Sequence, residues 1–275
     1  MQNEIQTAGR DFFLTTKRRI SFYRSRAYSA YPQLEHAIFT RNGGISRAPF
    51  DSLNLSHSVG DDPAAIEHNF QAVCRVLGIA SDQTVACHLV HGADVMAVTR
   101  ANRQPVMGYF DGLVTAEPDI FLYLRFGDCT PLLFFDPETP AVGLTHAGWR
   151  GTMKNAAGAT VAAMTRLGCN PANIIAIIGP AIGPCCYEVG PEVINAAAAS
   201  LAEPERLFQK NGKPGHAQFD MWAANRQQLA AAGVKHIIQS ELCTACHTDQ
   251  FFSHRAEQGQ TGRFGVILGL RGGAQ

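Results

Sequence analysis

Long apolar runs alternate with Ala-rich segments along the chain, and the two patterns predict strands and helices. Several of the runs are continuously apolar rather than alternating, which is typical of strands buried on both faces. Strands are predicted within residues 84–91, 94–99, 120–126, 132–136, 141–146, 174–179, 236–239 and 264–270.

Helices are predicted where apolar residues recur at a spacing of three or four. The segment 63–78 has Pro63 at a suitable first position and Gly78 as a stop. Its apolar stripe consists of Ile66, Phe70, Val73 and Leu77. Further helices are predicted over 153–168, from Pro191 onward, and from a capping Asp220 to Gly233.

The order of these elements predicts an α+β fold. The first six strands are separated by short turns as often as by helices, so a regular βαβ alternation is absent. We therefore expect large mixed β-sheets packed together and flanked by helices, in one catalytic domain over residues 31–275.

Residues 1–30 are predicted to form a basic, solvated N-terminal arm, with a transit peptide as the alternative. The charged residues of this segment are Arg10, Lys17, Arg18, Arg19, Arg24 and Arg26 against Glu4 and Asp11.

Composition limits the functional class. The 23 basic and 23 acidic residues give a formal net charge of +0, which argues against nucleic-acid or membrane-surface partners. No signal-peptide pattern and no apolar stretch of about 20 residues is visible, so a cytoplasmic protein is expected. The eight cysteines are then expected to bind metal, to react or to pack as thiols, rather than to form disulfides. The sequence does not indicate an oligomeric state.

Three side chains share one local design at the ends of predicted strands. His91 precedes Gly92, Cys129 stands between Asp128 and a Thr-Pro pair, and His146 precedes Ala-Gly. Two imidazoles and one thiolate suit zinc, and three protein ligands leave a fourth position for water or substrate. The ligands are far apart in sequence, so a core thiol with two hydrogen-bonded histidines remains open, as does a Cys129 nucleophile with His91 or His146 as base.

Longer strings make the sequence similar to a known family. They are "TRNGGIS", "HGADV", "DGLVT", "GDCTPLLFFD", "THAGWRGT", "IGPAIGPCCYEVG", "CTAC" and "FFSHR" with "TGRFGVI". In this order, from about Tyr31 to Leu270, they resemble the laccase-domain (multicopper polyphenol oxidoreductase, YfiH-like) family. The resemblance implies a zinc enzyme that phosphorolyses adenosine, inosine and methylthioadenosine and deaminates adenosine. Its zinc ligands fall on His91, Cys129 and His146.

Further residues gain candidate roles from that resemblance. Asp128 is a candidate catalytic proton carrier, with a partner orienting a ligand histidine as the alternative. Arg41, Asn42 and Arg150 lie among glycines and are candidate contacts for phosphate or ribose, and structural ion pairs are the alternative for the arginines.

Other chemistries compete with the zinc nucleoside enzyme. Copper could replace zinc in the same ligands, but multicopper oxidation needs many imidazoles, and no His-x-His pair occurs. A structural zinc in an interaction module is a third alternative, which three ligands disfavour. The "CTAC" pair, Cys243 and Cys246, is predicted to be a reduced thiol pair rather than a second metal site, because no second C-x-x-C exists.

Overall fold

A computed structural model describes residues 11–210 and 212–273 of the chain. Within this part, three sheets and six α-helices form the α+β fold predicted from the sequence. The helices are α1 (Arg26–Ser29), α2 (Pro63–Leu77), α3 (Trp149–Met153), α4 (Ala156–Arg166), α5 (Pro191–Ser200) and α6 (Met221–Ala231). Short 3₁₀ turns are η1 (His57–Val59), η2 (Ser81–Gln83), η3 (Pro171–Asn173) and η4 (Pro204–Leu207).

Two large sheets form the centre of the molecule. The seven strands of the first, in spatial order, are β1 (Phe12–Lys17), β2 (Ile20–Ser25), β3 (Leu34–Phe39), β16 (Phe264–Leu270), β8 (Phe121–Phe126), β4 (Thr84–His88) and β6 (Val106–Tyr109). The six of the second are β15 (His236–Gln239), β11 (Ile175–Ile178), β9 (Thr130–Asp136), β10 (Ala141–Ala147), β7 (Gly112–Thr115) and β5 (Val95–Ala97). Both sheets mix parallel and antiparallel pairs, as expected.

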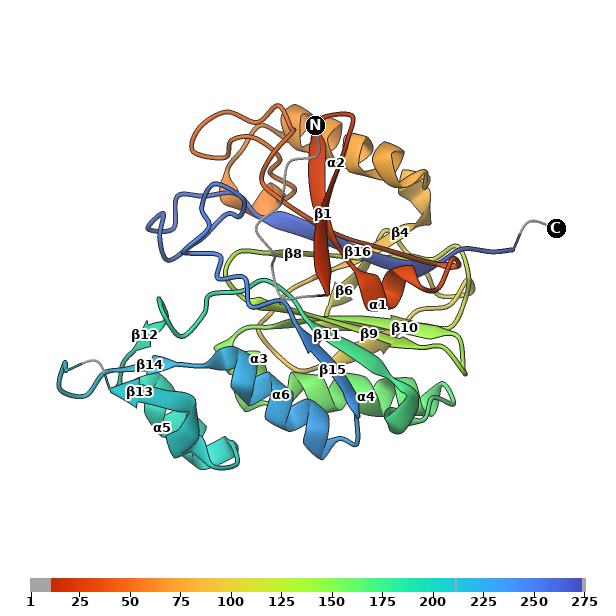
Figure 1. Ribbon diagram of the computed structural model, residues 1–275. Helices are drawn as coiled ribbons and strands as arrows, with labels where there is room; N and C mark the ends of the chain where they lie inside the picture. Colours follow the sequence, from red (N-terminus) through yellow and green to blue (C-terminus); the bar gives the residue numbers. More distant parts are fainter. Residues whose placement is uncertain (1–10, 211, 274–275) are drawn as a thin grey trace.

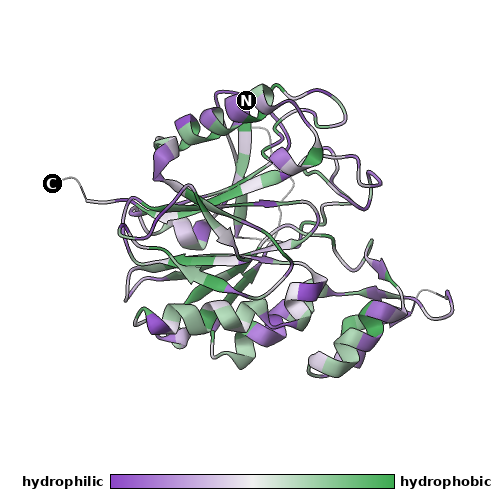
Figure 2. Cartoon of the chain, turned by 180° about the vertical axis from the view of Figure 1, so that it is seen from behind, coloured by the Kyte–Doolittle hydropathy of each residue, from purple (hydrophilic) through white to green (hydrophobic). Residues whose placement is uncertain are grey.

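The sheets pack face to face, and helices cover both outer faces. Helix α2 covers the seven-stranded sheet, and α4 and α6 cover the six-stranded one (Figure 1). Hydrophobic residues colour much of both large sheets, whereas the surrounding loops are largely hydrophilic (Figure 2). No helix of the described residues is long and apolar enough to span a membrane.

This layering explains the continuous apolar runs. In β9, Leu133 and Phe135 lie in the core between the sheets, whereas Leu132 and Phe134 face the helical layer. Because successive side chains of a strand point to opposite faces, a strand buried on both sides needs apolar residues at every position. All eight predicted runs contain a strand.

A small third sheet lies to one side of these layers. Its strands are β12 (Glu188–Val189), β14 (Ala217–Phe219) and β13 (Phe208–Lys210), in that spatial order. Together with α5 it projects at the left of the molecule (Figure 1). None of these three strands was predicted.

Two predictions need correction. Residues 12–25 do not form a solvated arm: β1 and β2 make a hairpin that pairs with β3, and Phe22 and Tyr23 are buried. Residues 1–10 lie outside the described residues. The helix predicted over 153–168 begins only at residue 156, because Asn155 is in the left-handed region (φ 62°) and caps α4 by accepting the backbone N–H of Gly158.

Candidate metal centre

The structure brings His91, Cys129 and His146 together. One ligand atom from each of the three side chains lies within 4.8 Å of the others. The register of β9 and β10 explains part of this, since His146 pairs with Pro131, two residues after Cys129. Two imidazole nitrogens and one sulfur at this spacing form a donor set that suits zinc. We call these residues the His–Cys–His centre.

Asp111 organises this centre, although no role was predicted for it. Its buried carboxylate accepts the backbone N–H groups of Val90, His91 and Gly92, at 3.3, 2.9 and 2.6 Å. It also accepts the Nδ1–H of His146 at 3.1 Å. That hydrogen bond leaves Nε2 of His146 for the metal, and the loop contacts hold His91 in a left-handed conformation (φ 57°).

Electrostatics in the centre favour the metal-binding form of the thiol. Burial raises the pKa of Cys129, but His146 and His91 outweigh it and lower the pKa to about 6. Burial lowers the pKa of His146, but Cys129 and Asp111 raise it to about 9. The pKa of Asp111 is lowered, because hydrogen bonds from His146 and Gly92 outweigh the effect of burial. Without metal, Cys129 and His146 therefore form a thiolate–imidazolium pair at neutral pH, and the thiolate is the form that binds metal.

Gly148 closes one side of the centre. A Cβ at this position would lie 2.8 Å from Sγ of Cys129 and 3.3 Å from Cδ2 of His91. Backbone alone can approach the ligands this closely. Gly148 of "HAGWRG" therefore leaves space for the centre, as expected of a ligand-binding turn.

Asp128 is buried beside Cys129 but contacts neither ligand histidine through a hydrogen bond. Its Oδ1 accepts the hydroxyl of Thr244 at 2.6 Å, and its Oδ2 accepts the backbone N–H of Arg255 at 2.7 Å. The orienting contact to a ligand histidine, which was the alternative for Asp128, is made by Asp111 instead. Asp128 joins three segments that are distant in sequence.

Arg41 makes the structural pairs that were its alternative. Its guanidinium donates to the carbonyls of Asp51 and Thr248 and to the carboxylate of Glu257, at 2.9, 2.8 and 2.9 Å. It also stacks on Phe252. Asn42 donates to the carbonyl of Asp249 at 2.9 Å. Both residues thus anchor their loop to residues 248–257.

Two other arginines lie closer to the Cys129 loop. A Cβ on Gly127 would be 3.2 Å from Cδ of Arg263, and the backbone N–H of Arg255 donates to Asp128, while its guanidinium donates to the carbonyl of Glu188. Arg150 follows Gly148, is half exposed, stacks on Trp149 and pairs with the exposed Glu192 at 3.1 Å. Arg255 and Arg263 belong to the "FFSHR" and "TGRFGVI" strings, so the sequence contained a signal for them but no argument for their role.

Comparison with known proteins places the chain in a family. The family model described as "Multi-copper polyphenol oxidoreductase laccase" matches residues 35–271. This chain belongs to that family. The match confirms the resemblance inferred from the motifs.

Laccase-family relatives match nearly the whole chain. The purine nucleoside phosphorylase YlmD of Geobacillus stearothermophilus is 41% identical over 244 residues, which cover 85% of this chain and 89% of the relative. The purine nucleoside phosphorylase YfiH of Escherichia coli is 35% identical over 231 residues, covering 84% and 91%. The crystal structure of YlmD from G. stearothermophilus superimposes with a TM-score of 0.88 at 38% identity, covering 94% of this chain and 99% of that one. The predicted fold class is therefore confirmed.

Proposed function

We propose that this chain is a zinc-dependent purine nucleoside phosphorylase. It would convert adenosine, inosine or methylthioadenosine with phosphate to the free base and the sugar 1-phosphate. The observation that carries the proposal is the His–Cys–His centre with three protein ligands. The names of relatives that are 41% and 35% identical support it.

Zinc is the proposed native metal, and copper is a possible substitute in the same ligands. A centre with three protein ligands has the donor count of catalytic rather than structural zinc sites. When bound, zinc supplies a Lewis acid at this point of the site. His146 and the loop of His91 are already oriented by Asp111, so the ligands are preorganised.

The chain's own residues would bind the substrates and move the proton. Arg150 and Arg263 are the proposed contacts to phosphate. A guanidinium group can donate two parallel N–H hydrogen bonds to two oxygens of one phosphate. Asp128 is the proposed proton carrier: its carboxylate is 8% exposed and is fixed by Thr244 and Arg255, so it has a defined position beside Cys129. The departing purine needs a proton, and the carboxylate of Asp128 would relay the one that dihydrogen phosphate loses when its oxygen bonds to the sugar carbon.

We propose adenosine deamination as a second activity of the same centre. In that reaction water adds at C6 of the purine and ammonia leaves, so a proton must move from the water to the departing amine. The observation that favours deamination is that a centre with only three protein ligands lies beside the buried carboxylate of Asp128, which is next to the ligand Cys129.

We place both activities in the cytoplasm. None of the eight cysteines is in a disulfide, and reducing compartments favour that state.

Polyphenol oxidation, the activity in the family's description, fits this chain less well. Multicopper chemistry requires several copper centres with many imidazoles. Among the described residues, the side-chain groups that could hold a metal are the His–Cys–His centre and a group of four cysteines, and they contain only His91 and His146 as histidines. One copper ion in place of zinc would not make such a system.

Product analysis tests the proposed function. Purified zinc-loaded protein is incubated with adenosine, with and without inorganic phosphate, and the products are separated by chromatography. We expect adenine and ribose 1-phosphate only in the presence of phosphate, inosine in its absence, and inosine together with its free base hypoxanthine when phosphate is present. If no adenine, inosine or hypoxanthine forms, the proposal is wrong. Adenine that forms equally without phosphate would indicate hydrolysis instead of phosphorolysis.

A further inference from the structure

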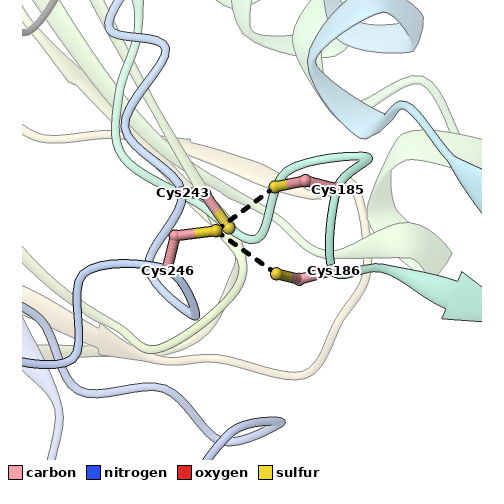
Figure 3. Close-up of side chains that lie close together, drawn as sticks. All are labelled: Cys185, Cys186, Cys243 and Cys246. Atoms are coloured by element: carbon pink, nitrogen blue, oxygen red, sulfur yellow. Dashed lines mark hydrogen bonds between the residues drawn. The ribbon is translucent and has the colours of Figure 1, made fainter.

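A second cluster of metal-binding side chains lies outside the His–Cys–His centre. The ligand atoms of Cys185, Cys186, Cys243 and Cys246 lie within 4.8 Å of one another. Figure 3 shows the four sulfur atoms converging from two loops. We call these residues the four-cysteine cluster. The prediction of a reduced pair at Cys243 and Cys246 assumed that no second cysteine pair completes a ligand set, and the structure shows that Cys185 and Cys186 supply one.

The sheet topology explains why these cysteines meet. Strands β11 and β15 are parallel neighbours, so the loops that follow them leave the same edge of the sheet. The pairing continues past the strands as a parallel bridge between Ala181 and Cys243. The loop after β11 carries Cys185 and Cys186, and the loop after β15 carries Cys243 and Cys246.

The spacing suits one tetrahedral metal ion. Sγ of Cys246 lies 3.5 Å from Sγ of Cys185 and 3.4 Å from Sγ of Cys186 (Figure 3). Zinc bound to four sulfurs at about 2.3 Å places the sulfurs roughly 3.8 Å apart. All four cysteines are free, so no sulfur is already consumed by a disulfide.

The surrounding backbone supports a metal-bound sulfur. The N–H of Gly183 donates to Sγ of Cys243 at 3.2 Å. A Cβ at Gly183 would lie 2.7 Å from the Trp222 ring, so only glycine fits between the ring and Cys243. Cys243 is buried, whereas Cys185 and Cys246 are exposed, which gives the ion a path from solvent.

We propose that the four-cysteine cluster is a second, structural zinc site. Four protein ligands leave no open position, which is the arrangement of structural rather than catalytic zinc. The site would clamp the loop after β11 to the loop after β15. This inference does not rest on the proposed function.

The clamp would also position Asp128. Thr244, which lies between the two cysteines of its loop, donates its hydroxyl to Asp128 at 2.6 Å and its N–H to Ala181 at 3.1 Å. On the other loop, the N–H of Ile182 donates to the carbonyl of Asp128 at 3.0 Å. Zinc at the cluster would therefore hold both loops that fix the residue before Cys129.

Zinc counting by native mass spectrometry tests the proposal without any substrate. We expect two zinc ions per wild-type chain, one in a Cys185→Ser/Cys246→Ser variant, one in Cys129→Ala and none when all three changes are combined. The matched control is Cys169→Ala, a buried cysteine outside both clusters, which should retain two. A wild-type chain with a single zinc that is lost in Cys129→Ala would overturn the proposal. Disulfides among the four cysteines in protein purified under reducing conditions would overturn it as well.

A second test uses the wild-type protein, so its result does not depend on whether a variant folds. Zinc K-edge absorption reports the average number of sulfur ligands per ion. With both sites filled, the average exceeds two sulfurs per zinc, whereas the His–Cys–His centre alone supplies one. An average of one sulfur in fully loaded protein would contradict a four-cysteine site.

Discussion

Replacing Cys129 with alanine is expected to abolish metal binding at the His–Cys–His centre and to lower nucleoside turnover by about a thousandfold or more. Metal polarisation is worth several kcal/mol of barrier, and each 1.4 kcal/mol changes the rate about tenfold. Two histidines remain, which is too few ligands for tight zinc binding. The protein should stay folded, because Cys129 lies in the loop between β8 and β9 rather than in the apolar core of either sheet.

Adenine release and circular dichroism together check this expectation. The control is Cys74→Ala, which removes a buried thiol of the α2 layer far from any candidate metal cluster in the described chain. Cys74→Ala should retain zinc and most of the activity. A folded Cys129→Ala variant with full turnover would show that the assignment of the centre is wrong.

Replacing Asp111 with asparagine is expected to weaken zinc binding by about 10–100-fold, the usual effect of removing a partner that orients a metal-ligating histidine. The amide keeps the size of the carboxylate but loses its charge and one of its acceptor oxygens. It can no longer accept three backbone N–H groups and the His146 Nδ1–H together. Both His91 and His146 lose orientation.

Asp136→Asn is the matched control. The buried Asp136 carboxylate also accepts three backbone N–H groups, from Glu138, Thr139 and Asn170, but it contacts no ligand histidine. Both variants should lose about 1–3 kcal/mol of unfolding free energy through an unsatisfied buried group. Only Asp111→Asn should change the zinc dissociation constant, as measured by competition with a chelator. Equal zinc affinity in the two variants would show that Asp111 has no orienting role.

The sequence was sufficient for the two main layers and for selecting His91, Cys129 and His146, which the structure brings together. Strands buried on both faces need unbroken apolar runs, and such runs are visible without a structure, as in 132–136. The edge hairpin of β1 and β2 was not predicted, because Lys17, Arg18 and Arg19 made this segment resemble a solvated basic arm. They occupy the end and the turn of the hairpin, where solvent is available, while Phe22 and Tyr23 are buried on opposite faces of the sheet.

The roles of residues that contact segments distant in the sequence could not be predicted. Asp111 works because it receives N–H groups from residues 90–92, and nothing local to "DGLVT" indicates that contact. The four-cysteine cluster was missed for the same reason: Cys186 and Cys243 are far apart in sequence, and only the parallel pairing of β11 and β15 brings their loops together.

Zinc dependence is tested most directly by measuring the adenine that metal-stripped protein releases from adenosine and phosphate, before and after zinc is returned. We expect no release above the uncatalysed rate from the stripped protein and recovery once zinc is added. Full release by a stripped and folded protein would contradict it. Such a result would favour the thiolate of Cys129, whose pKa of about 6 keeps it ionised, as a metal-free nucleophile.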